Sequence, residues 1–154
     1  MSLNRTFLSK KWEDWNRDFS ALANPILLIL LPFIFLGTSE IFYRLLFVLL
    51  LNELLCSLIK IFYHKQRPSG QTFSTLIEKI DAGSFPSIHA SRITIAYLTL
   101  FIYSEHIAIK LVLLLLMVLV MISRVVLKKH YWVDVMGGFL IGLFLWGLFF
   151  YKIF

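Results

Sequence analysis

SRVVLKKHYWVD, residues 123–134, joins the end of one apolar run to the start of the next. It places Arg124, His130 and Asp134 where a membrane helix would meet water. If the segment is helical from His130 onward, His130 and Asp134 lie one turn apart on the same face. The carboxylate then accepts the proton of one imidazole nitrogen and leaves the other nitrogen able to attack. The guanidinium of Arg124 suits phosphate oxygens. The pattern indicates phosphate chemistry, and the alternative is a helix end whose charges only reach the lipid headgroups.

The composition predicts a single integral membrane domain over residues 1–154. With 154 residues, 59% of them hydrophobic, the chain is too apolar for a soluble domain and too short for two domains. The 15 Lys+Arg against 9 Asp+Glu give a net charge of +6, which favours anionic lipid or phosphate partners rather than nucleic acid. The four histidines show no metal-ligand spacing, so we expect neither a metal nor another cofactor.

Hydropathy predicts an all-α bundle with about five transmembrane helices. The expected spans cover residues 19–39, 41–62, 87–104, 107–127 and 132–154. Residues 1–20 alternate aromatic and charged positions at helical spacing and predict an amphipathic helix in the membrane interface. Residues 63–84 read as a polar loop. Gly138 and Gly142 form a G-x-x-x-G step, typical of close helix packing.

Alternation of these spans brings three polar clusters to one membrane face. The second span ends near Lys60, with Arg67 and Pro68 beyond it after six intervening residues. The third span opens with Pro86-Ser87-Ile88-His89, where Ser87 can cap the helix and its N-terminus can bind an anion. Residues 123–134 close the set. Glu53, near the middle of the second span, is costly in lipid and should face the bundle interior; packing explains it as well as catalysis does.

Together the clusters resemble the three signature motifs of the type-2 phosphatidic acid phosphatase family. The motifs are Lys60-(six residues)-Arg67-Pro68, the tetrapeptide at 86–89, and Ser123-Arg124-(five)-His130-(three)-Asp134. The superfamily also contains bacterial acid phosphatases and vanadium-dependent haloperoxidases. The resemblance covers about residues 60–134. It departs at Ile88, where the family usually has glycine, which puts a very close backbone approach to phosphate in doubt.

The resemblance implies a role for each motif residue. His130 is the expected nucleophile, forming a phosphohistidine, and Asp134 is expected to orient it. His89 is expected to protonate the leaving oxygen and then to activate water. The groups expected to bind the phosphoryl oxygens are Lys60, Arg67, Ser87, Arg124 and the backbone near Ile88. Three cations around one phosphate make a divalent metal unnecessary.

The expected substrate and partner is a phosphorylated lipid of the bilayer; no obligate protein partner is inferred. Candidates are lipid A 1-phosphate, which we favour, phosphatidylglycerophosphate and undecaprenyl diphosphate, or a broad range that includes phosphatidic acid. The small size resembles compact bacterial envelope enzymes. Two alternatives stay open: a lipid-phosphate binding or transport protein without activity, and a vanadate-dependent haloperoxidase-like enzyme. The complete His89, His130 and Asp134 set argues against a simple binder.

The resemblance places the protein in the bacterial inner (cytoplasmic) membrane, with the active site on the periplasmic face. The charge distribution favours the opposite orientation. Most lysines and arginines lie on the side of the motifs, and the positive-inside tendency would make that side cytoplasmic. Lys60, Arg67 and Arg124 are, however, assigned to phosphate. We therefore predict a periplasmic site.

Overall fold

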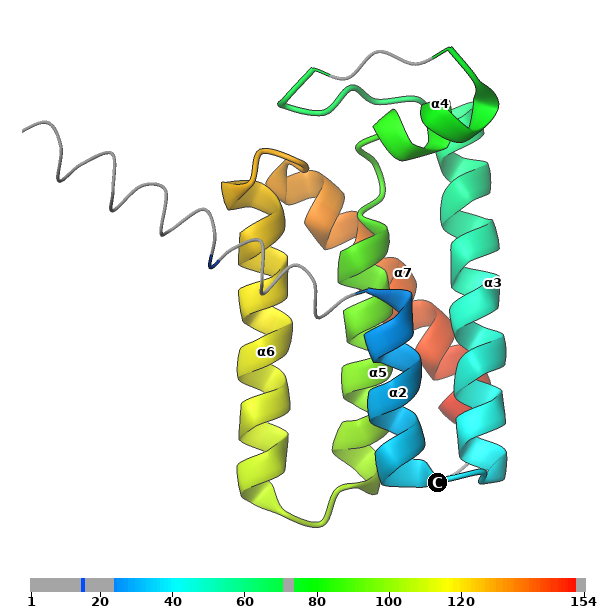
Figure 1. The fold of residues 1–154 in the computed structure, drawn as a ribbon, viewed down its shortest axis with the longest axis vertical. Helices are drawn as coiled ribbons and strands as arrows, with labels where there is room; N and C mark the ends of the chain where they lie inside the picture. The colour runs from blue at the N-terminus through cyan, green and yellow to red at the C-terminus, as the bar shows by residue number, and fades with distance from the viewer. Residues whose placement is uncertain (1–14, 16–23, 71–73, 152–154) are drawn as a thin grey trace, which may run out of the picture.

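The protein is seen in a computed structural model that describes Trp15 and residues 24–70 and 74–151. Within these residues the chain is helical and has no strand, which confirms the all-α prediction. The interfacial helix predicted over residues 1–20 lies outside the described residues, apart from the exposed Trp15. The helices of the described part are α2 (Pro25–Leu36), α3 (Glu40–Phe62), α4 (Leu76–Ala82), α5 (Ile88–Tyr103), α6 (Ile107–Val126) and α7 (Trp132–Phe150) (Figure 1).

Helices α3, α6 and α7 are long and apolar enough to cross a membrane, with 23, 20 and 19 residues. Helix α5 has 16 residues, or about 24 Å, and is shorter than a bilayer core of about 30 Å. Helix α2 is shorter than the span predicted over residues 19–39. It begins at Pro25 because Asn24 caps it and Pro25 occupies its first turn. The described part of α2 has 12 residues, about 18 Å. The polytopic helical bundle is confirmed, and the count of five spans stays a prediction.

Helix α5 lies at the centre of the bundle and contacts α2, α3, α6 and α7 (Figure 1). One side of α5 packs with α2 and α6 around Tyr97 and Val120. The other side packs with α3 and α7 around Ile95 and Leu145. The outer faces of the bundle carry exposed leucines and phenylalanines, as expected for surfaces in contact with lipid.

The backbones of α5 and α7 approach each other closely at two glycines. A Cβ atom added to Gly138 would lie 2.2 Å from the carbonyl oxygen of Ser87, and one on Gly142 would lie 2.6 Å from that of Ser91. No larger side chain fits there unless the helices move apart. The packing interpretation of the G-x-x-x-G step is confirmed.

The segment 63–84 is not a loop throughout, because residues 76–82 form α4. Thr75 caps this helix with its side chain, and the Glu78 carboxylate accepts from the Thr75 backbone nitrogen, completing a capping box. The prediction of a loop was wrong for these seven residues. Figure 1 shows α4 at the end of the bundle where α3 ends and α5 begins.

Candidate active site

Two helix ends and two helix starts meet at one end of the bundle, and they carry the three sequence motifs. Helix α3 ends there with Lys60 in its last turn, and α6 ends there with Arg124. Helices α5 and α7 start there, at Ile88 and Trp132 (Figure 1). Residues that are up to 74 positions apart, from Lys60 to Asp134, are therefore gathered at one membrane face.

Three cations are buried in this end of the bundle. Lys60 is 3% exposed and Arg124 2%, and the side chain of Arg67 is 8% exposed. Their charges repel one another, and an acidic group near them is the exposed Asp81, 3.8 Å from Arg67. Burial lowers the pKa of the Arg67 guanidinium, and Asp81 opposes that effect. Buried like charges are costly without a counterion, so the arrangement is suited to an anion.

Arg67 also supplies a donor that nothing in the described part of the chain satisfies. Its buried Nε has no hydrogen-bond partner among those residues. A buried donor normally has a partner, so a ligand oxygen is the natural one. This fits a phosphoryl group better than it fits a purely structural role for the cluster.

The start of α5 forms the next wall of the site. The Ser87 hydroxyl oxygen accepts from the Ala90 backbone nitrogen at 3.4 Å, and the Ser87 nitrogen donates to the carbonyl of Asp134 at 2.9 Å. Ser87 is thus fixed as the helix cap, beside the positive end of the helix dipole. Ile88 follows in ordinary helical conformation. The backbone at Ile88 does not itself require glycine.

His130 lies in the turn that leads from α6 to α7. Its backbone nitrogen donates to the Arg124 carbonyl at 3.1 Å, and its buried imidazole has Nδ1 2.7 Å from the Ser84 carbonyl oxygen. A carbonyl only accepts, so Nδ1 carries the proton and Nε2 keeps its lone pair. Burial lowers the pKa of His130 to about 3, and Arg124, Arg67 and Lys60 add to the effect. At neutral pH the imidazole is uncharged and nucleophilic.

The sequence predicted a direct hydrogen bond between Asp134 and the His130 imidazole, and this prediction was wrong. Helix α7 begins at Trp132, so His130 precedes it and the two residues do not stack on a helix face. Lys128, with a left-handed φ of 53°, turns the chain sharply after α6. The His130 Nδ1 partner is the Ser84 carbonyl, and Asp134 bonds the Ser84 hydroxyl instead.

The Asp134 carboxylate accepts three hydrogen bonds. Lys65 Nζ lies 2.6 Å from Oδ1, the Tyr131 backbone nitrogen lies 2.8 Å from Oδ2, and the Ser84 hydroxyl donates to Oδ2. Its bond to Tyr131 also stabilises the start of α7. Asp134 is therefore connected to His130 through Ser84.

His89 is the second residue of α5 and is half-buried at this end of the bundle. Its imidazole interacts with the charged groups Arg124 and Arg92 and with the His130 imidazole. The structure thus brings His89 to the same charged cluster as His130. The two histidines expected from the sequence therefore lie at the same cluster of buried cations.

Sequence reasoning missed Lys65 and Ser84 as site residues. Both lie in the segment 63–84 that the sequence predicted as a polar loop, and no spacing rule marks either residue. The sequence also did not predict a partner for Glu53. In the structure the Glu53 carboxylate accepts hydrogen bonds from both Nε and Nη2 of Arg92 in α5. Within residues 24–70 and 74–151 no three His, Cys, Asp or Glu side chains form a metal-binding group.

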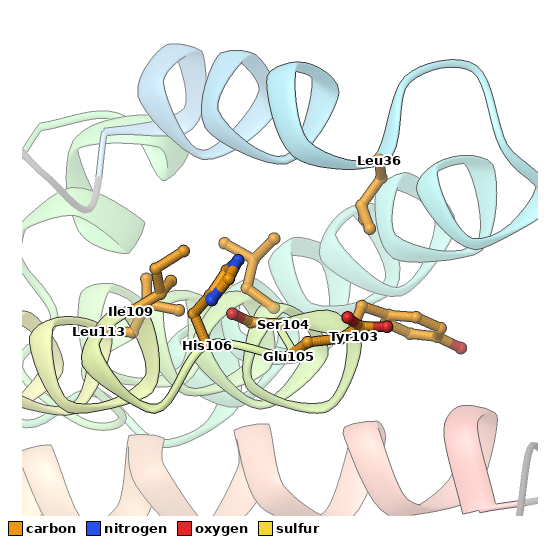
Figure 2. Close-up of a pocket in the computed structure, with 8 residues that line it drawn as sticks. Leu36, Tyr103, Ser104, Glu105, His106, Ile109 and Leu113 are labelled. Carbon is orange, nitrogen blue, oxygen red and sulfur yellow. The ribbon is translucent and has the colours of Figure 1, made fainter.

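Two of the cavities along the described part of the bundle differ in their lining. One, of about 250 Å³, ends at the Glu53–Arg92 pair and is otherwise apolar, with Leu28, Ile29, Leu46, Leu49 and Leu50 as its walls. The other, of about 290 Å³, lies where α5 turns into α6, beside Glu105 and His106 (Figure 2). No lysine or arginine lines it, and it is at the other end of α5 from His89. Of the two, the first includes Arg92, whose charge acts on His89 and Arg124.

Known proteins resemble this chain in sequence and in fold. The family model described as the PAP2 superfamily matches residues 42–154. The crystal structure of Aquifex aeolicus LpxE is similar, with a TM-score of 0.71 and 24% identity over 89% of this chain and 84% of that one. The PAP2-type phosphatidylglycerolphosphate phosphatase from Bacillus subtilis is similar with a TM-score of 0.68 and 20% identity, over 96% of this chain and 85% of its own. The likeness to these two structures shows a shared fold.

Proposed function

The chain belongs to the PAP2 superfamily and is a multi-pass membrane protein, and from this premise we propose that it is a membrane lipid phosphatase. The proposed reaction removes a phosphate from a phosphomonoester or diphosphate head group through a phosphohistidine on His130. The observation that carries the proposal is the buried, neutral imidazole of His130 beside three buried cations. A nucleophile next to clustered positive charge is what phosphoryl transfer requires.

In the first step Nε2 of His130 attacks phosphorus and the bond to the lipid oxygen breaks. Lys60, Arg67 and Arg124, with the amides at the start of α5, bind the phosphoryl oxygens and neutralise the charge that grows on them. His89 gives a proton to the leaving oxygen. The Ser84 carbonyl holds Nδ1–H, so the imidazole is in the reactive tautomer from the start.

In the second step His89 takes a proton from water and the resulting oxygen attacks the phosphohistidine. The P–N bond breaks, inorganic phosphate leaves, and His130 returns to its neutral form. The protein cations supply the charge that a divalent metal supplies in other phosphatases. We therefore expect full activity in EDTA.

A lipid substrate is supported by the position of the site at the ends of membrane helices. Its phosphate can reach the cluster while an acyl chain remains in the bilayer or enters the apolar cavity beside Glu53 and Arg92. We propose lipid A 1-phosphate, phosphatidylglycerophosphate or undecaprenyl diphosphate as substrates. The similar Bacillus subtilis protein is a phosphatidylglycerolphosphate phosphatase, which supports the second of these. The proposed location is the bacterial inner membrane, with the site facing the periplasm.

The test is phosphate release by the purified protein in detergent with EDTA, against these three lipids and phosphatidic acid. His130→Ala should lower turnover by a factor of about 10³ or more, because the nucleophile is gone. The matched control is His106→Ala, which removes an exposed histidine at the other end of the bundle and should leave the rate unchanged.

Other outcomes would point elsewhere. Binding of phosphate or vanadate by a folded protein that turns over none of the lipids would favour the binding or transport alternative. Halide oxidation with added vanadate would favour a haloperoxidase-like enzyme. A strict requirement for Mg²⁺ would contradict the phosphohistidine mechanism.

A further inference from the structure

Three residues, Lys65, Asp134 and Ser84, form a continuous chain of hydrogen bonds that ends at His130. Lys65 donates to Asp134 at 2.6 Å, the Ser84 hydroxyl donates to the same carboxylate, and His130 Nδ1 donates to the Ser84 carbonyl at 2.7 Å. The Ser84 nitrogen also donates to the Lys65 carbonyl at 2.7 Å. Each of the three polar groups of Ser84 is therefore bonded to a member of this chain.

Lys65 supplies the positive charge at the outer end of the chain. Its side chain is 29% exposed, whereas Asp134 is fully buried. Its ammonium also lies over the Tyr131 ring, 4.6 Å from the centroid. A buried carboxylate without a counterion is costly, so Lys65 is the group that allows Asp134 to stay ionised behind the imidazole.

We propose that Lys65 and Ser84 are positioning residues for His130: Lys65 balances the charge of Asp134, and the carboxylate fixes Ser84, whose carbonyl sets the tautomer and direction of the imidazole. The inference rests on the proposed phosphatase function. Neither residue touches the phosphate, and both act through other groups. Lys65 bonds Asp134 rather than pointing its ammonium at a ligand, which separates it from the cations Lys60 and Arg67.

The effect of Lys65 on His130 follows from the charges around the imidazole. Lys60 of α3, Arg67 of the following loop and Arg124 of α6 act on the imidazole directly, and His89 of α5 interacts with it. Lys65 and Asp134 are linked to it through Ser84. Arg92 and Lys129 act on the neighbouring His89, and Asp81 of α4 acts on Arg67. Without the charge of Lys65, the negative charge of Asp134 is less compensated. A negative neighbour favours the protonated imidazole, so His130 would bind a proton at higher pH.

The experiment compares Lys65→Met, Lys65→Arg and the control Lys79→Met by kcat, KM and the pH dependence of kcat/KM. Lys79 is on α4 at the same membrane face and loses the same charge when changed to Met. For Lys65→Met we expect kcat to fall on the order of 10–100-fold, as for outer partners of other catalytic groups. KM should change little, and the acidic limb should move to higher pH. Lys65→Arg should restore most of the rate, and Lys79→Met should match the wild type.

Ser84→Ala is the second variant, and it decides the question if Lys65→Met fails to fold. It keeps the carbonyl but removes the hydroxyl that Asp134 holds, so kcat should fall while phosphate binding persists. Unchanged kcat and pH profile in these variants, with an active wild type, would overturn the inference alone. A wild type that releases no phosphate would instead overturn the proposed function.

Discussion

His130 sets the pH range in which the proposed reaction can run. Its imidazole must be neutral to attack, and its burial among Arg124, Arg67 and Lys60 disfavours the charged form. Because its pKa is lowered to about 3, the neutral form persists as the pH falls through about 6.5, where an ordinary histidine gains its proton. The residue is ready to act in mildly acidic as well as neutral surroundings.

We therefore expect no acidic limb near pH 6.5 from His130 in kcat/KM of the free enzyme. The measurement is kcat/KM between about pH 4 and 8, and the fall due to His130 should lie well below about pH 5. The phosphate of the substrate titrates near about pH 6, so its ionisation is measured separately by ³¹P NMR and divided out. A residual limb centred on the ordinary histidine pKa would show that His130 is not protected as the structure indicates.

The site residues that the sequence predicted are those whose side chains have a role in the proposed reaction. Lys60, Arg67, His89, Arg124 and His130 all reach the cluster where they were expected. Ser84 could not be predicted, because it contacts His130 through a backbone carbonyl that any residue carries. The route from Asp134 to His130 was missed because the left-handed turn at Lys128 delays the start of α7.

The contact between helices α5 and α7 leaves no space for a side chain at Gly138. Gly138 allows the backbone of α7 to touch the Ser87 carbonyl, next to the bond from Ser87 nitrogen to Asp134. A methyl group there would push apart the two helix starts that carry His89 and Asp134. We therefore expect both stability and activity to depend on the absence of a side chain at Gly138.

Gly138→Ala should lower the free energy of unfolding by about 1–3 kcal/mol, the usual cost of overpacking, and should reduce activity more than tenfold. Thermal unfolding in detergent and phosphate release measure the two effects. Gly147→Ala is the control on the same helix, because a Cβ there meets nothing within 4 Å. It should be neutral or slightly stabilising. Equal behaviour of the two variants would contradict the close contact.

The Glu53–Arg92 pair gives a second prediction for the helices. Glu53→Gln leaves the largely buried Arg92 with a weaker partner and should cost about 1–3 kcal/mol of unfolding free energy. Glu40→Gln breaks the Glu40–Arg44 pair, whose carboxylate is 83% exposed, and should cost less than about 1 kcal/mol. Thermal unfolding of both variants tests the difference. A larger loss in Glu40→Gln would show that the interhelical pair does not stabilise the bundle.

The long helices were predicted well because a membrane span is set by composition and length. Helices α3, α6 and α7 lie within a few residues of the expected spans. Helix α4 was missed although its Thr75-x-x-Glu78 signature is present, because it lies in a segment rich in Gly and charge. Helix α2 is short because Asn24 and Pro25 define a helix start inside an uninterrupted apolar run.

For the molecule as a whole, the side of the membrane that the site faces can be tested with two cysteines. With a periplasmic site, a cysteine at position 66 is outside and one at position 105 is inside. We expect Gln66→Cys to react with an impermeant maleimide in spheroplasts, and Glu105→Cys to react only after lysis. Positions 66 and 105 are both exposed, and the natural Cys56 is buried. The reverse pattern would place the site in the cytoplasm.

The pairing of Glu53 with Arg92 also bears on how the chain enters the membrane. Helix α5 is short, and its arginine makes insertion at the translocon unfavourable by roughly 2.5–3.5 kcal/mol when near the middle of a helix. Helix α3 leaves the ribosome first and carries the carboxylate that matches this charge. We therefore expect α5, the central helix of the bundle, to insert into the membrane only after α3 is present.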